Sequence, residues 1–129
     1  MKVFFVDDSV IVVERLKNLL TEIEGIEAVG HAVNEKDAVD LILKTKPDLV
    51  ILDIRLRSGN GIEVLARIKK EHPPPVVIML TNYPYPQYRK RCMELGADYF
   101  FDKVTEIEKV IEVVKRLVKN KTAKRHIPD

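Results

Sequence analysis

The stretch Asp48-Leu49-Val50-Ile51-Leu52-Asp53 decides the fold, because four consecutive apolar residues run directly into a carboxylate. An uninterrupted apolar run of this length is typical of a central strand covered on both faces, as in the parallel sheet of an α/β domain. Asp53 is then expected at the carboxyl end of the strand, the edge at which open parallel sheets place their ligand sites. A function for this chain therefore has to account for a carboxylate at that edge.

Length and composition predict one globular domain. The chain has 129 residues, of which 46% are hydrophobic and 33% are charged. A chain of this length can bury a hydrophobic core that is stable without disulfide bonds or a structural metal ion. The apolar run near the amino terminus, Val3 to Val6, is too short for a signal peptide, and no other run approaches the roughly 20 residues of a membrane span. Cys92 is the one cysteine, which excludes an internal disulfide. We expect a cytoplasmic protein without a membrane span.

The net charge of +2 conceals a basic carboxyl-terminal segment. Residues 113–129 carry six Lys or Arg residues against one acid, and the other 112 residues hold 16 bases and 19 acids. A mildly acidic body is not the footprint of a nucleic-acid-binding domain, which carries its basic residues over a folded face. The basic segment is compatible with contact to RNA, lipid or an acidic partner, but a solvated helix end is the simpler interpretation.

Five predicted strands alternate with five predicted helices. The strands lie at 2–6, 26–33, 48–53, 76–80 and 99–101, and apolar residues with helical spacing follow each of them. Strict alternation predicts a parallel sheet with helices on both faces, because each right-handed crossover lays a helix over the sheet. In the last helix the periodicity runs from Ile107 to Val118. We therefore expect one domain over residues 1–119 and a frayed basic tail over 120–129.

Polar residues follow four of the predicted strands and should meet at one edge of the sheet. Three crowded carboxylates need a cation at neutral pH, and Mg²⁺ is a hard ion that takes one or two carboxylates and keeps open positions. A hydroxyl and an ammonium suit the remaining oxygens of a phosphoryl group, and a carboxylate can itself be the nucleophile. These features predict phosphoryl transfer. The residues are Asp7 and Asp8 after the first strand, Asp53 at the end of the third, Thr81 after the fourth and Lys103 after the fifth.

Each of these residues also has an ordinary structural interpretation. Asp-Asp-Ser before a helix is a common N-cap, Asp53 can form a turn, and Thr81 can cap a strand end. Lys103 alone would be a solvated surface lysine. The functional interpretation is favoured because four core strands each place a phosphate-compatible group at the same edge.

With these residues in place, the chain resembles the receiver domain of two-component response regulators over about residues 2–119. The resemblance implies a flavodoxin-like, doubly wound sheet of five parallel strands in the order 2-1-3-4-5 with five helices. It is carried by Val6-Asp7-Asp8-Ser9, Leu52-Asp53-Ile54-Arg55-Leu56, Gly59-Asn60-Gly61, Leu80-Thr81-Asn82 and Gly96-Ala97-Asp98-Tyr99-Phe100-Phe101-Asp102-Lys103.

The resemblance also implies a role for each site residue. Asp53 would accept the phosphoryl group from the phosphohistidine of a sensor histidine kinase. Mg²⁺ would be bound directly by Asp8, Asp53 and the backbone carbonyl of Arg55, and by Asp7 largely through water. Thr81 would move towards the phosphoryl oxygens, Lys103 would pair with the group, and Phe100 would be the aromatic switch, although a plain core aromatic is an equal alternative.

The resemblance further implies an output. A downstream protein would bind the face made by the fourth helix, the fifth strand and the fifth helix. We expect a stand-alone receiver, a monomer or weak dimer, without a DNA-binding domain. It would catalyse only its own phosphorylation and dephosphorylation.

The sequence departs from the family pattern near the site. Val104 follows Lys103 where the family usually has proline, commonly after a cis bond. Asn82 stands where a small residue is usual, and Arg57 where proline is common. Arg55 and Tyr83 are expected to flank the pocket and to tune the lifetime of the acyl phosphate.

Two other classes of function stay open. One is an interaction module on the same scaffold that works without phosphorylation. The other is a Mg²⁺-dependent phosphatase with an aspartyl nucleophile. Such enzymes commonly carry a second Asp two residues beyond the nucleophile, where this chain has Arg55.

Overall fold

The computed structural model describes residues 1–125 and contains the predicted alternation of strands and helices. All strand pairs are parallel and the order is β2-β1-β3-β4-β5, which confirms the predicted topology. The elements are β1 (Lys2–Val6), α1 (Val10–Thr21), β2 (Glu27–Ala32), α2 (Glu35–Thr45), β3 (Leu49–Leu52), α3 (Gly61–Ile68), β4 (Val76–Thr81), α4 (Pro86–Glu94), β5 (Tyr99–Asp102) and α5 (Ile107–Arg125).

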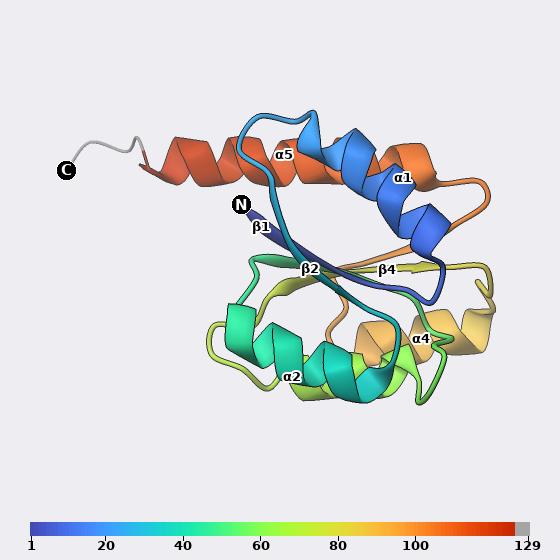
Figure 1. Cartoon of the computed structure of the whole chain (residues 1–129). Helices are drawn as coiled ribbons and strands as arrows, with labels where there is room; N and C mark the ends of the chain where they lie inside the picture. Colours follow the sequence, from blue (N-terminus) through green and yellow to red (C-terminus); the bar gives the residue numbers. More distant parts are fainter. Residues whose placement is uncertain (126–129) are drawn as a thin grey trace.

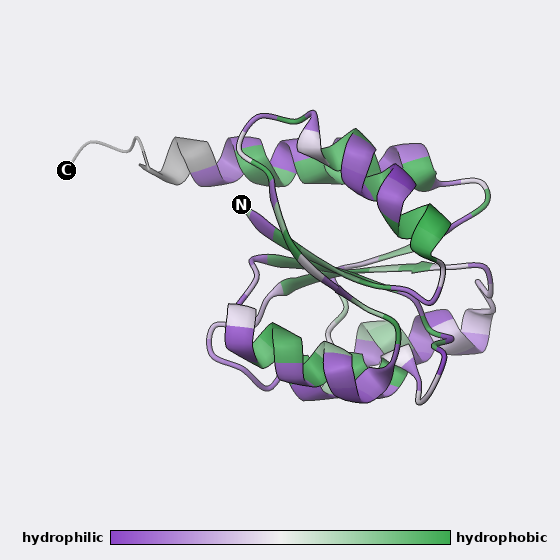
Figure 2. Ribbon diagram, viewed as in Figure 1, coloured by the Kyte–Doolittle hydropathy of each residue, from purple (hydrophilic) through white to green (hydrophobic). Residues whose placement is uncertain are grey.

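Helices cover the sheet on both faces, with α1 and α5 on one side and α2 and α4 on the other (Figure 1). Alternate residues of β3 point to opposite layers, as the pleat of a strand requires. Leu49 and Ile51 pack with α1 and α5, whereas Val50 and Leu52 pack with α2, α3 and α4. Figure 2 shows the apolar, green residues concentrated along the strands and on the helix sides that face them. The central strand is therefore buried on both faces, as its composition predicts.

Side-chain caps fix where three helices begin. The Ser9 hydroxyl accepts the Val12 N–H at 3.3 Å, and the Asn34 side chain accepts the Asp37 N–H at 2.9 Å. The Asn60 side chain caps α3 in the same way, at 3.1 Å from the Glu63 nitrogen. Each cap satisfies an N–H of the first turn that has no partner inside the helix. Since Ser9 caps α1, the two aspartates before it are left for another purpose.

The register of the sheet brings the polar strand ends together. Val6 pairs with Leu52, and Leu52 pairs with Met79. The residues that follow these positions thus emerge side by side at the carboxyl edge of the sheet. Thr81 pairs with Asp102, immediately before Lys103.

Helix α5 is longer than predicted. Residues 120–125 of the expected tail continue the helix to Arg125, while residues 126–129 lie outside the described part. The sequence of residues 120–125 continues no apolar period, but it includes neither glycine nor proline and can therefore extend a helix. Lys121 Nζ lies 3.0 Å from Asp48 Oδ2 and ties the extension to the start of β3. In Figure 1 the end of α5 reaches past the sheet. Among the described helices, none is both long and apolar enough to cross a bilayer.

Candidate active site and metal centre

Three carboxylates meet at the carboxyl edge of the sheet. Carboxylate oxygens of Asp7, Asp8 and Asp53, one from each, all lie within 4.8 Å of one another. Asp7 and Asp53 are buried, and Asp8 is exposed to solvent. The predicted cluster therefore forms, with one of its members accessible from outside.

Lys103 joins this cluster from the end of β5. Its Nζ lies 2.6 Å from Asp53 Oδ2 and 2.7 Å from Asp7 Oδ2, and all three side chains are almost completely buried. The lysine is thus an internal cation shared by two carboxylates, and the interpretation as a solvated surface lysine is wrong. A buried charge of this kind is tolerated only when it is paired and hydrogen-bonded.

The backbone orients the other carboxylate oxygens. The Ile54 N–H donates to Asp53 Oδ1 at 2.7 Å, and the Ser9 N–H donates to Asp7 Oδ1 at 2.8 Å. Each of these carboxylates therefore has one oxygen on a backbone N–H and the other on Lys103. Both side chains are fixed in one orientation by the turn that follows their strand.

Burial and charge shift the acid–base properties of the pair. Burial raises the pKa of Asp53, and the nearby Asp7 charge adds to this, while the Lys103 ammonium and the Thr81 hydroxyl act in the opposite direction. Burial alone would lower the pKa of Lys103, but its bonds to Asp53 and Asp7 and their charges raise it. The two directions agree with one cation shared between carboxylates that repel each other. Three carboxylates and one ammonium leave a formal charge of −2.

Thr81 is completely buried at the end of β4. Its hydroxyl oxygen accepts the Tyr83 N–H at 3.0 Å, and its carbonyl accepts the Lys103 N–H at 2.8 Å. Thr81 therefore bonds both to the loop that leads into α4 and to the residue that neutralises Asp53.

Phe100 is buried in the layer between the sheet and α2, α3 and α4. The Arg89 guanidinium of α4 lies 5.5 Å from its ring centroid. The ring thus occupies a core position in this structure, and its rotation remains a prediction.

Val104, one of the departures from the family pattern, has a visible consequence, and the two residues expected to flank the pocket contact each other. The Val104 N–H donates to Asp102 Oδ1 at 2.8 Å, a bond that a proline could not make. The peptide bond after Lys103 is trans, since within residues 1–125 the only cis bond is His72–Pro73. The Arg55 guanidinium lies 3.8 Å from the centroid of the Tyr83 ring, so these two residues form one contact at the rim of the site.

Sequence reasoning missed two features that support the carboxylates. His31 Nε2 lies 2.8 Å from the Asp7 carbonyl oxygen, and since a carbonyl only accepts, this nitrogen carries the proton. A Cβ on Gly61 would overlap the carbonyl oxygen of Asp53, so this glycine permits a close backbone approach. His31 stands 24 residues from Asp7 and had no sequence signal, whereas Gly61 was noted only as a turn residue.

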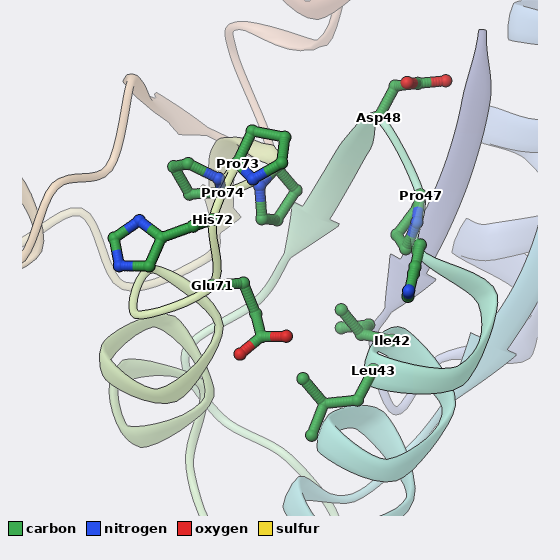
Figure 3. Close-up of a pocket in the computed structure, with 10 residues that line it drawn as sticks. Ile42, Leu43, Pro47, Asp48, Glu71, His72, Pro73 and Pro74 are labelled. Atoms are coloured by element: carbon green, nitrogen blue, oxygen red, sulfur yellow. The ribbon is translucent and has the colours of Figure 1, made fainter.

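A separate hollow lies at the opposite edge of the sheet (Figure 3). It has a volume of about 490 Å³ and is lined by the end of α2 and by the loop before β4, which contains Pro73 and Pro74. Asp48, which directly precedes β3, also lines it. None of the predicted site residues contributes to this hollow.

Comparison with known proteins gives one consistent result. The family model described as "Response regulator receiver domain" matches residues 3–115. The chain is 34% identical over 121 residues to the sensory transduction protein LytT of Bacillus anthracis, which covers 94% of this chain and 48% of that protein. It is 30% identical over 122 residues to the response regulator protein VraR of Staphylococcus saprophyticus, covering 95% of this chain and 58% of that protein. The chain thus spans about half the length of these curated relatives.

Solved structures agree with this result. The response regulator domain of Thermotoga maritima CheB matches with a TM-score of 0.80 and 26% identity, covering 93% of this chain and 94% of that one. A DNA-binding response regulator of the LuxR family from Staphylococcus aureus matches with a TM-score of 0.82 and 27% identity, covering 91% and 98%.

Proposed function

This chain belongs to the response regulator receiver domains, and on that premise we propose that Asp53 accepts a phosphoryl group from a phosphohistidine of a sensor histidine kinase. The observation that carries the proposal is the pairing of Asp53 with Lys103, 2.6 Å apart, beside two further carboxylates. Among the described residues, the buried charged side chains are Asp7, Asp53 and Lys103, and all three belong to this cluster. Phosphoryl transfer needs mainly such positioning and charge neutralisation.

The composition of the pocket supports Mg²⁺ as the cofactor. The formal charge of −2 is balanced by one divalent cation, and the ligands are oxygens, which Mg²⁺ prefers. Asp8 and Asp53 would bind the ion directly together with the backbone carbonyl of Arg55. Asp7 would act largely through water, as the resemblance to the family implies. When bound, the ion would neutralise charge on the phosphoryl oxygens.

The chain's own residues supply the rest of the reaction. An Asp53 carboxylate oxygen attacks phosphorus, an O–P bond forms, and the P–N bond of the phosphohistidine breaks with its electron pair left on the imidazole nitrogen. Lys103 then exchanges its bond to the free carboxylate for one to a phosphoryl oxygen. Hydrolysis of the acyl phosphate returns inorganic phosphate and Asp53. We propose no independent substrate.

Thr81 would transmit this change to the loop that leads into α4. Its hydroxyl would leave the Tyr83 N–H and donate to a phosphoryl oxygen, and Phe100 would rotate as the threonine moves. The result would be a population shift on the face formed by α4, β5 and α5, where a downstream protein would bind.

Incubation with Mg²⁺ and a small acyl phosphate donor, followed by intact-mass analysis, tests the proposal. We expect the wild-type protein to gain the mass of one phosphoryl group and Asp53→Asn to gain none. Asp40→Asn, an exposed aspartate on α2, is the matched control and should behave as wild type. A wild-type mass that stays unchanged, with no binding of beryllofluoride either, would refute phosphorylation of Asp53.

A further inference from the structure

The positively charged side chain of Arg55 makes a cation–π contact with an aromatic ring. Its guanidinium carbon lies 3.8 Å from the centroid of the Tyr83 ring, and its side chain is exposed. Within the described part of the chain, no carboxylate lies within ion-pair distance of Arg55. A guanidinium stacks on aromatic faces and also binds phosphate oxygens through two parallel N–H groups, so it can exchange one partner for the other.

The stack joins the two loops that leave the strands carrying Asp53 and Thr81. Arg55 follows Asp53 by two residues, and Tyr83 follows Thr81 by two residues, at the ends of the neighbouring strands β3 and β4. The Tyr83 N–H is itself bonded to the Thr81 hydroxyl oxygen at 3.0 Å. The guanidinium thus belongs to the loop that leaves Asp53, two residues from the side chain on which a phosphoryl group would add negative charge.

We infer that Arg55 leaves the Tyr83 ring and binds the phosphoryl oxygens once Asp53 is phosphorylated. The inference rests on the proposed function and deepens it, because it assigns a second cation to the phosphoryl group besides Lys103. An exposed cation–π contact is weaker than charge-assisted hydrogen bonds from a guanidinium to a phosphoryl dianion, so the exchange is favourable. In the unphosphorylated protein no such anion competes with the ring.

The exchange gives the loop before α4 its own response to phosphorylation. The Tyr83 ring contacts Tyr85 at a centroid distance of 6.3 Å, and Tyr85 contacts Tyr88 at 5.6 Å. Tyr85 occupies the N-cap of α4 without a side-chain capping bond. Packing of these three rings therefore stabilises the first turn of α4. When Arg55 leaves, the Tyr83 ring loses one of its contacts.

A double-mutant cycle tests this exchange. Beryllofluoride, which mimics the phosphoryl group, is titrated by calorimetry at saturating Mg²⁺ into wild type, Arg55→Met, Tyr83→Leu and the double variant. We expect Arg55→Met to weaken binding about tenfold, as the loss of a charge-assisted bond does. Tyr83→Leu removes the competing ring and should tighten binding about two- to fivefold. The double variant should match Arg55→Met, because Tyr83 acts only through the arginine.

Matched controls separate this effect from folding and from metal binding. Arg57→Met changes an exposed arginine in the same loop and should leave the affinity for beryllofluoride as in wild type. Mg²⁺ titration should give the same affinity for every variant, since Arg55 contributes only its backbone carbonyl to the proposed metal site.

Three outcomes would overturn the inference. They are an unchanged affinity in Arg55→Met, weaker binding in Tyr83→Leu, and additive effects in the double variant. If wild type binds beryllofluoride and gains a phosphoryl group while these results appear, only the role of Arg55 is refuted. A wild-type protein that does neither refutes the proposed function together with the inference.

Discussion

Lys103 Nζ lies 2.6 Å from Asp53 Oδ2, so the lysine expected to bind a phosphoryl group is bonded to the free carboxylate. The same ammonium lies 2.7 Å from Asp7 Oδ2. One buried cation therefore stabilises two buried carboxylates that would otherwise repel each other. This arrangement connects the stability of the domain with the state of its active site.

Lys103→Met should destabilise the metal-free protein. The substitution keeps the length of the side chain but leaves Asp7 and Asp53 buried without their cation, which costs about 3 kcal/mol in comparable buried pairs. Urea denaturation in EDTA at neutral pH measures the change in the free energy of unfolding. Mg²⁺ should restore part of the loss. Lys109→Met, which removes an exposed pair with Glu106, is the control and should change stability by less than about 1 kcal/mol. Equal stability of Lys103→Met and wild type in EDTA would contradict this account.

Mg²⁺ should stabilise the wild-type protein and Asp8→Asn should remove most of this effect. At ten times its dissociation constant, an ion that binds only the folded state adds about 1.4 kcal/mol to the free energy of unfolding. For a domain of this size that is an increase in melting temperature of about 5 °C. Without metal, Asp8→Asn should be more stable than wild type because it relieves repulsion within the cluster. Asp40→Asn should respond to Mg²⁺ like wild type, and a full response in Asp8→Asn would place the ion elsewhere.

The sequence predicted that the side chains of the candidate site meet at one edge of the sheet, but not which contacts they make there. Each of Asp7, Asp53, Thr81 and Lys103 directly ends or follows a strand, and parallel strands bring such positions to one edge. The hydrogen-bond partner of each side chain depends on distances across the sheet, and the local sequence pattern does not determine these distances. The bond of Lys103 to both Asp7 and Asp53 is of this kind.

Two further features lay outside the reach of sequence patterns for different physical reasons. An apolar period reports the face of a helix that packs on the core, so it ends at Val118 although α5 continues to Arg125. The contact between Arg55 and Tyr83 joins two loops 28 residues apart, and only the register of β3 with β4 brings them together. The sequence predicted that both residues flank the pocket, but not that they touch.

Gly61→Ala should disturb Asp53, the proposed acceptor, through its backbone. Any Cβ at this position overlaps the carbonyl oxygen of Asp53, and the Gly61 N–H already donates to the Ile54 carbonyl at 2.6 Å. The loop after β3 must shift, which costs about 1–3 kcal/mol in crowded interiors and moves Asp53 away from Lys103. We expect slower phosphorylation as measured by intact mass against time, together with lower stability. Ser58→Ala, in the same loop but exposed, should change neither quantity. If Gly61→Ala had the stability and the phosphorylation rate of wild type, the loop would accommodate the added Cβ without a loss of free energy.

Cys92 should make the stability of the domain fall at high pH. The side chain is fully buried between α4 and the sheet, and burial raises the pKa of its thiol to about 11, from about 9 in the unfolded chain. The thiol is therefore neutral in both states below pH 9, where its contribution to stability is complete. Between pH 9 and 11 the unfolded chain loses this proton and the folded protein keeps it, so about 2–3 kcal/mol of stability is lost.

The difference between wild type and Cys92→Ala isolates this titration from that of the lysines and tyrosines. Urea denaturation at several pH values should show the free energy of unfolding of wild type falling more steeply above pH 9 than that of the variant. The variant should be less stable at neutral pH, because it leaves a small cavity. The folded protein should also react slowly with thiol reagents at pH 8 until urea unfolds it. Parallel curves for the two proteins across this range would mean that the thiol ionises equally well in the folded state, against its complete burial beneath α4.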